Sequence, residues 1–287
     1  MTSSPERPPD RQRYLGLDLG GTNIKVVVLE ERGGEGPVTV EQTALPTEAH
    51  RGPEAVVGLL GEVGREVLAR RGPVAGIGVG IPGIHDERGH AVLLPNLAGD
   101  WNGVPVQAPL SRALGQPVTL VNDARAFSLA ESVLGAGRGL GTVVCMVLGT
   151  GVGGGVVVDG RLVLGTGIAG EIGHQTVLVD GPLCGCGNQG CAEALTRADV
   201  FARLGGRASA AEVYAAARAG DATAQAAVDH VVKWLGVAMA NAFVLLAPDA
   251  FVIGGGIAAA GDLLLGPLEE AVRRHVFLAP PERIRVL

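Results

Sequence analysis

Residues 14–29 read YLGLDLGGTNIKVVVL, in which two apolar stretches flank a short run of glycines. Such stretches are typical of strands, and Gly20-Gly21-Thr22 between them is typical of a tight turn, so the sequence predicts a β-hairpin. One interpretation is an ordinary glycine-tipped hairpin with Asp18 as a turn residue. The other is a phosphate site, in which the backbone N–H groups of the tip hold phosphate oxygens and Asp18 orients a magnesium ion through water.

The same pattern returns about 130 residues later, which favours the phosphate site. Residues 143–160 read VVCMVLGTGVGGGVVVDG, so Gly149-Thr150-Gly151 again lies between apolar stretches, without an acid in the place of Asp18. Two such units predict a duplicated domain that closes on one nucleotide from both sides. Cys145, inside the second copy, is interpreted as a small core residue.

Between and after these copies, helical and strand patterns alternate, as in an α/β protein. A buried strand over 74–81 ends at Gly83, where the backbone could approach a sugar, and a strand over 250–253 leads into Gly254-Gly255-Gly256, where adenosine or ribose could lie. The other predicted elements are a strand over 118–121 and helices over 53–71, 196–200, 209–218, 222–246 and 257–275.

Asn122-Asp123 follows the strand over 118–121 and begins a helix. An acid at the carboxyl end of a strand in an open α/β sheet lies where catalytic groups are found. Asn and Asp are also the preferred helix caps, and position alone favours capping for Asp123. The predicted apolar stripe of this helix consists of Ala124, Phe127, Ala130, Val133 and Leu134.

Residues 171–193 read EIGHQTVLVDGPLCGCGNQGCAE and hold three of the four cysteines of the chain. Three thiolates and one imidazole suit a closed tetrahedral zinc site, which is usually structural. The ligands would be His174, Cys184, Cys186 and Cys191. The alternatives are small buried thiols beside a core histidine, or a disulfide that leaves an odd thiol.

Two acids flank these predicted ligands, because Glu171 lies three residues before His174 and Glu193 lies two residues after Cys191. Zinc would hold both carboxylates on one rigid scaffold, and a ligating imidazole keeps a second nitrogen for substrate. Two carboxylates and an N–H group facing one cavity would suit a polyhydroxylated ligand such as a sugar.

The composition excludes several classes of partner. The chain has 287 residues, of which 47% are hydrophobic, and a net charge of −6, which argues against a nucleic-acid surface. Residues 1–13 are polar and are interpreted as a disordered tail rather than a signal peptide. The most apolar stretch, 237–247, is too short to span a bilayer, so a cytoplasmic protein is expected.

Taken together, these motifs closely resemble the ROK family of sugar kinases, which includes bacterial zinc-containing glucokinases. The resemblance covers the chain from Tyr14 to its end. Its most specific parts are Asp18-x-Gly-Gly-Thr22, Asn122-Asp123-Ala124, Gly149-Thr-Gly-x-Gly-Gly-Gly155, Glu171-x-Gly-His174 and Cys184-x-Cys186-Gly-Asn-x-Gly-Cys191-x-Glu193.

The resemblance implies an α/β protein with the actin-like ATPase (ribonuclease H-like) fold, with two lobes around a nucleotide and sugar cleft. We expect the lobes to span 14–117 and 118–287, with a zinc knuckle over 174–191, and the protein to be a homodimer or a tetramer. Asp123 is then the general base, which reverses the preference for capping. The implied sugar-binding residues are Gly83, Asn122, Asp123, Glu171, His174 and Glu193. The implied residues for ATP and Mg²⁺ are Asp18, Gly20, Gly21, Thr22, Lys25, Gly149, Thr150 and Gly151. Gly254, Gly255 and Gly256 would contact the adenosine.

The implied activity is that of a glucokinase in glycolysis, which transfers the γ-phosphoryl group of ATP to the 6-hydroxyl of glucose. Alternatives are an N-acetylmannosamine kinase or a fructokinase, a polyphosphate or ADP donor, and a non-catalytic sugar-binding regulator. Only thirteen residues precede the first strand, too few for the DNA-binding module of the family's repressors. The chain also stops before the final helix of the family, so we expect either that the small lobe closes without that helix or that the chain is truncated.

Overall fold

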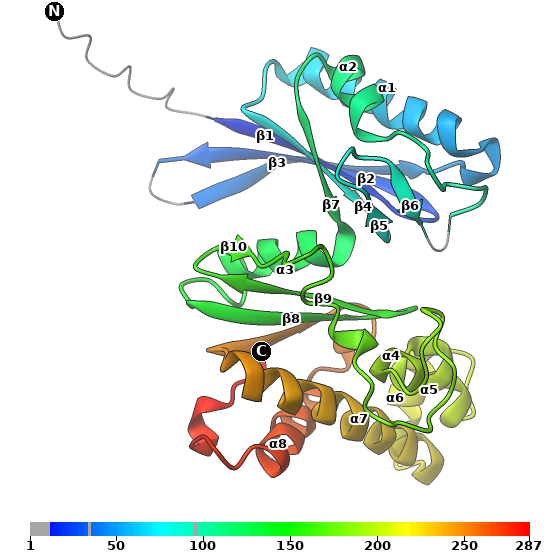
Figure 1. Ribbon diagram of the computed structural model, residues 1–287, viewed down its shortest axis with the longest axis vertical. Coiled ribbons are helices and arrows are strands. Elements are labelled where there is room, and N and C mark those ends of the chain that lie inside the picture. The colour runs from blue at the N-terminus through cyan, green and yellow to red at the C-terminus, as the bar shows by residue number, and fades with distance from the viewer. Residues whose placement is uncertain (1–11, 34–35, 95–96) are drawn as a thin grey trace, which may run out of the picture. The chain divides into compact units, whose positions relative to one another are not determined.

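The computed structural model describes residues 12–33, 36–94 and 97–287 (Figure 1). The chain forms two compact units, Met1–Ala126 and Phe127–Leu287. Most of the predicted tail, residues 1–11, lies outside the described residues, and Arg13 already begins the first strand.

The first unit is built on a five-stranded sheet in the order β3-β2-β1-β4-β7. β1 pairs antiparallel with β2 and parallel with β4, which in turn pairs parallel with β7. The predicted hairpin around Gly20-Gly21-Thr22 is therefore confirmed. The strands are β1 (Arg13–Leu19), β2 (Asn23–Arg32), β3 (Gly36–Pro46), β4 (Gly76–Ile81) and β7 (Val118–Asn122), with a small separate pair β5 (Ile84–His85) and β6 (Ala91–Leu93).

Two helices cover this sheet, α1 (Pro53–Arg71) and α2 (Gln107–Leu114), and a short 3-10 helix η1 (Ala49–Arg51) precedes α1. Alternate residues of β2 are buried, as expected for a strand with one packed face. Leu60 of α1 and Leu110 of α2 are completely buried in the same core as these strand residues. The helical spacing predicted over 53–71 is thus confirmed.

The second unit repeats the arrangement of the first. Its sheet has the order β10-β9-β8-β11, with β8 antiparallel to β9 and parallel to β11. Val286 pairs in parallel with Phe251 of β11, at the place that β7 takes in the first sheet. The predicted duplication is therefore visible in the order and direction of the strands. They are β8 (Thr142–Leu148), β9 (Val152–Val158), β10 (Arg161–Leu162) and β11 (Ala250–Gly254).

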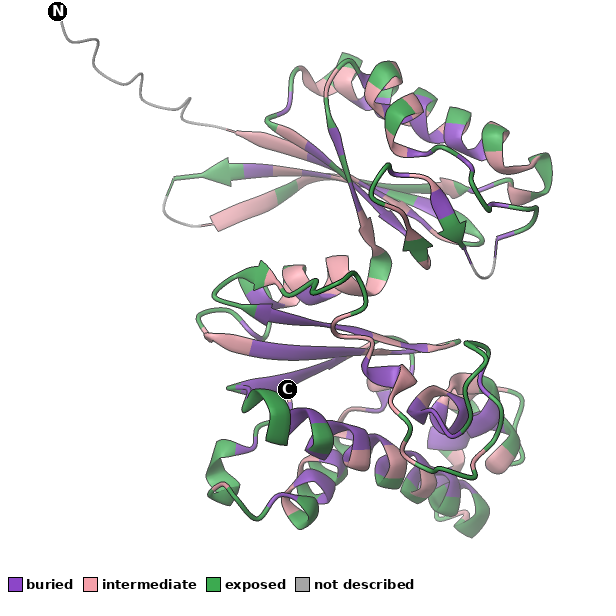
Figure 2. Cartoon of the chain, in the orientation of Figure 1, coloured by how far each residue is buried: buried purple, intermediate pink, exposed green. Residues whose placement is uncertain are grey.

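One long helix, α7, forms the centre of the second unit. It spans Ala222–Leu246, as predicted, and much of it is buried (Figure 2). By length and composition it could cross a membrane, but 56% of its most apolar window is buried inside the protein, as in the core helix of a folded domain. The other helices are α3 (Asp123–Val133), η2 (Ile172–His174), α4 (Ala192–Thr196), α5 (Ala198–Leu204), α6 (Ala210–Arg218), η3 (Ala258–Leu263), α8 (Leu265–His275) and η4 (Pro281–Arg283).

The border between the units lies later than the one expected at 117/118. Strand β7 pairs with β4 of the first sheet, and the first unit continues to Ala126. Backbone hydrogen bonds between neighbouring strands decide this membership, and the local apolar pattern does not reveal them.

Three predicted helices differ from the observed ones. The helix over 257–275 is interrupted near its start, because Gly261 inside η3 has φ 58° and ψ −124°, which an α-helix cannot contain, and α8 begins only at Leu265. The helix over 196–200 is the junction of α4 and α5, at which Arg197 has an extended backbone. On α3 the buried residues are Ser128 and Ser132 instead of the apolar stripe, since a small side chain fits over Gly155 of β9.

Candidate active site and metal centre

Four predicted ligands converge in the second unit. The donor atoms of His174, Cys184, Cys186 and Cys191 all lie within 4.8 Å of one another. His174 Nδ1 lies 3.7 Å from Cys184 Sγ, and the sulfurs of Cys186 and Cys191 are also 3.7 Å apart. Ligands about 2.3 Å from a tetrahedral zinc ion would be roughly 3.8 Å apart, so the residues fit the metal. All four cysteines of the chain are free thiols, which disfavours the disulfide.

The ligands come from three successive pieces of backbone. His174 ends η2, Cys184 and Cys186 lie in the following loop, and Cys191 is the N-cap residue of α4. The loop is closed on itself, because the amide of Cys184 donates to the carbonyl of Asn188 at 2.8 Å. The metal ligands are thereby fixed to the start of α4.

The thiols differ in how readily they ionise. Burial raises the pKa of Cys184 to about 12, whereas a hydrogen bond from the backbone N–H of Asn188 lowers the pKa of Cys186. Three adjacent thiolates would repel one another, so a divalent cation among them would offset both the burial and the repulsion. The donor set therefore fits zinc chemically as well as geometrically.

The turn between β8 and β9 lies against this centre. The backbone N–H of Val152 donates to Glu193 Oε2 at 2.9 Å, while Glu193 Oε1 lies 3.6 Å from Cys184 Sγ. On the other side of the turn, the N–H of Ala198 donates to the carbonyl of Gly149 at 2.9 Å. Glu193 thus joins the metal loop to the predicted phosphate turn.

The predicted adenosine turn is next to the phosphate turn. β11, which ends at Gly254, is the parallel neighbour of β8, and the N–H of Ile257 donates to the carbonyl of Leu148 at 3.1 Å. Arg218 of α6 donates to the carbonyl of Ala260 in η3 at 2.7 Å and so supports the segment after the turn. The structure therefore brings together two of the three predicted glycine turns.

The third glycine turn lies in the first unit between β1 and β2. Thr47 Oγ1 donates to the carbonyl of Gly20 at 2.6 Å, and the N–H of Thr47 donates to the carbonyl of Thr22 at 2.9 Å. Thr47 is fully buried. Lys25 Nζ lies 3.2 Å from Asp18 Oδ2 across the hairpin, and both side chains reach solvent.

Asn122 and Gly83 are also brought together, at the ends of β7 and β4. Asn122 Nδ2 donates to the carbonyl of Gly83 at 3.0 Å, and Asn122 Oδ1 accepts from the N–H of Arg125 at 3.1 Å. The second contact is that of a helix N-cap, so Asn122 caps α3. Asp123 is the first residue of α3 and is exposed, and its Oδ1 accepts from the N–H of Ala124.

Comparison with known proteins decides the family. The sequence matches the ROK family over residues 14–286. The chain belongs to the ROK family.

The similar ROK proteins include sugar kinases. The chain is 38% identical to a glucokinase of Thermotoga maritima, over 92% of this chain and 88% of that one. A ROK hexokinase from Thermus thermophilus has a TM-score of 0.83 at 33% identity, over 96% and 92% of the two chains. A ROK glucokinase of Streptomyces griseus, solved with glucose and AMPPNP, has a TM-score of 0.77 at 29% identity, over 96% and 93%. The fold is accordingly the actin-like ATPase fold of ROK sugar kinases, as expected.

Two residues that support the predicted site were not identified from the sequence. Thr47 and Ala198 hold the two predicted phosphate turns through contacts with distant parts of the chain. Neither residue carries a distinctive signal, because a threonine after a strand and an alanine at a helix start are ordinary.

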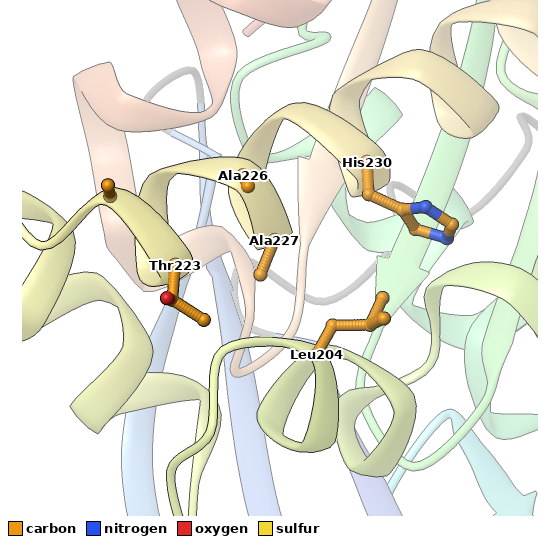
Figure 3. A pocket seen from close by; sticks show the side chains of 6 residues that line it. Leu204, Thr223, Ala226, Ala227 and His230 are labelled. Carbon is orange, nitrogen blue, oxygen red and sulfur yellow. The ribbon is translucent and has the colours of Figure 1, made fainter.

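One pocket of the second unit lies elsewhere. It has a volume of about 390 Å³ and is lined by Leu204 of α5 and by residues of α7 that include Thr223 and His230 (Figure 3). Its lining contains none of the site residues predicted for this ROK chain.

Proposed function

We propose that this ROK chain is a glucokinase that transfers the γ-phosphoryl group of ATP to the 6-hydroxyl of glucose. The observation that carries this proposal is that Asn122 and Asp123 have different roles at the start of α3. Asn122 makes the N-cap hydrogen bond of α3, so capping does not require Asp123. The exposed Asp123 carboxylate at the start of α3 then suits a general base. The glucokinase of Thermotoga maritima supports the choice of glucose.

In the proposed reaction, Asp123 accepts the proton of the sugar 6-hydroxyl as that oxygen attacks the γ-phosphorus. The bond between the γ-phosphorus and the bridging oxygen breaks, and ADP leaves. A carboxylate is suited to this step because its oxygens can accept a proton.

Nucleotide binding is assigned to the glycine turns. Gly21 and Thr22, and likewise Thr150 and Gly151, would present backbone N–H groups to phosphate oxygens. Gly20 and Gly149 would shape the two turns, because their own N–H groups donate to the carbonyls of Asn23 and Gly151. Gly254–Gly256 would take the adenosine, and Lys25 and Asp18 flank the first turn. Magnesium, when bound, neutralises charge on the phosphates, and Asp18 would hold it through water.

Sugar binding is assigned to the polar groups that the sequence predicts for it. We assign hydroxyl contacts to Asn122 and to the backbone at Gly83, and to Glu171, His174 and Glu193 beside the metal centre. His174 supports this assignment because its Nδ1 faces Cys184, which leaves Nε2 for a substrate hydroxyl. Zinc held by His174, Cys184, Cys186 and Cys191 would keep these groups in place.

The proposal includes a cytoplasmic homodimer. Phe277 and Leu278 are 87% and 89% exposed, and adjacent apolar side chains this open are suited to an interface. Light scattering of the purified protein tests the homodimer against a monomer or a tetramer.

A coupled assay with a panel of sugars and donors tests the activity. We expect glucose and ATP to be the best pair. Preference for N-acetylmannosamine or fructose would move the chain to another kinase of the family, and preference for polyphosphate or ADP would change the donor. Sugar binding without turnover for any pair would indicate a regulator instead.

A further inference from the structure

The β8–β9 turn is held at both ends by one short segment of chain. Glu193, in the first turn of α4, accepts the N–H of Val152, and Ala198, at the start of α5, donates to the carbonyl of Gly149. Only Gly149, Thr150 and Gly151 lie between Leu148 and Val152, and the N–H of Gly149 donates to the carbonyl of Gly151 at 2.9 Å. The conformation of the turn is therefore fixed from inside and from outside.

The contact with Glu193 leaves no room for a Cβ on Gly151 unless the carboxylate moves. A Cβ placed on Gly151 would lie 2.5 Å from Glu193 Oε2, closer than a real side chain can come. The carboxylate therefore occupies the space beside the turn and is more than a distant hydrogen-bond partner.

Glu193 is itself fixed by the metal loop. Cys191, a predicted zinc ligand, is the N-cap residue of α4, and Glu193 is the second residue of that helix. Its Oε1 lies 3.6 Å from Cys184 Sγ, so the two oxygens of one carboxylate face two different structures. A displacement of the metal loop would move Oε2 away from Val152.

We propose that Glu193 is a positioning residue for nucleotide: it holds the β8–β9 turn in the form that receives phosphate oxygens, in addition to its proposed contact with sugar. This inference rests on the proposed function, because it takes the turn to be a phosphate site. It predicts that changes at Glu193 reach ATP binding through the turn, without a contact between Glu193 and the nucleotide.

Two substitutions at Glu193 separate this role from a sugar contact. Glu193→Ala removes the acceptor of the Val152 N–H. Glu193→Gln can keep it, because the amide oxygen can face Val152 while the amide nitrogen donates to the thiolate of Cys184. We therefore expect hydrogen exchange at Val152 to become at least about tenfold faster in Glu193→Ala and to stay near the wild-type rate in Glu193→Gln. AMPPNP affinity should fall about five- to tenfold in Glu193→Ala and change less than about twofold in Glu193→Gln.

A second variant approaches the turn from its other end, away from the metal loop. Ala198→Pro removes the N–H that donates to Gly149. Proline is well accommodated at the first position of a helix, and Arg197 before it already has φ −62° and ψ 159°. For Ala198→Pro we expect the same loss of AMPPNP affinity with unchanged zinc content. This variant therefore tests the role of the turn even if Glu193→Ala loses its zinc. Glu269→Ala is the matched control, because that carboxylate accepts the N–H of Val286 at 3.0 Å elsewhere in the unit.

Hydrogen exchange and affinity together distinguish the possible results. Faster exchange at Val152 together with weaker AMPPNP binding in Glu193→Ala, rescued in Glu193→Gln, supports the proposal. Unchanged exchange and unchanged AMPPNP binding in both Glu193→Ala and Ala198→Pro overturns it. Faster exchange with unchanged AMPPNP binding also overturns it, because the hold on the turn then does not control nucleotide affinity. The coupled assay decides separately whether the proposed function fails.

Discussion

A Cβ on Gly173 would lie 1.9 Å from the carbonyl oxygen of Val152, so η2 packs directly on the backbone of β9. Val152 is thus contacted twice, by Gly173 at its carbonyl and by Glu193 at its N–H. The Glu171-Ile-Gly-His174 motif needs its glycine for this close approach, and the approach sets Glu171 and His174 at the start of β9.

Gly173→Ala should therefore destabilise the second unit. The added Cβ would clash with the backbone of Val152, which cannot rotate away as a side chain can. We therefore expect a loss of about 1–3 kcal/mol in the free energy of unfolding. Chemical denaturation measures it. Gly266→Ala in α8 is the control, since a Cβ there meets nothing within 4 Å. Equal stability of the two variants would show that η2 does not pack on Val152 as described.

Each chain should hold one zinc ion. The four donor atoms match the size of a tetrahedral zinc site, so metal analysis of protein kept free of chelators should give about one equivalent. Cys186→Ser should lose most of it, whereas Cys145→Ala should keep it, because Cys145 is buried in the second sheet. Undiminished zinc in Cys186→Ser would contradict the four-ligand site.

Asp123→Asn should remove most of the turnover without changing the fold. The side chain keeps its shape but can no longer accept a proton, so kcat should fall by at least about two orders of magnitude. Stability should change little, because Asn122 caps α3. Steady-state kinetics, sugar affinity and melting temperature on one preparation check this. A variant that turns over near the wild-type rate would refute Asp123 as the base.

Glu193→Gln should weaken sugar binding while nucleotide binding persists. The substitution removes a charged acceptor from the sugar hydroxyl, which should cost about 1.5–3 kcal/mol of sugar affinity. Calorimetric titration with glucose and with AMPPNP measures both. Equal losses for the two ligands would indicate instead that the metal loop has unfolded.

Mild acid should destabilise the protein through His230. Burial lowers the pKa of His230, and the nearby Lys233 and Arg203 lower it further, so the folded state prefers the neutral ring. The unfolded chain takes up the proton first, and stability should decline as pH falls below about 6.5 toward the folded pKa. Urea denaturation between about pH 7.5 and 5 should show this decline. His230→Gln should reduce this dependence of stability on pH. His275→Gln, at the exposed end of α8, is the control and should keep it. An unchanged slope in His230→Gln would exclude His230 as its source.

The sequence predicted the elements whose signals are local. The two glycine-tipped hairpins, α1 and α7 follow from apolar spacing over neighbouring residues, and the metal ligands follow from the close spacing of their cysteines. The prediction failed where a distant segment decides the outcome. Gly155 decides which face of α3 is buried, and the pairing of β7 with β4 decides that β7 belongs to the sheet of the first unit.

The sequence by itself determined the ROK family, the duplicated strand–turn–strand units and the cluster of one histidine and three cysteines that is predicted to hold zinc. Only the tertiary structure decided what holds the turns: Thr47 closes the first, and Glu193 reaches Val152 across 41 positions of sequence. It also decided that Asn122, rather than Asp123, caps α3. The physical reason is that a hydrogen bond between distant residues depends on how the packed core brings the backbone together, which no local spacing of residues encodes.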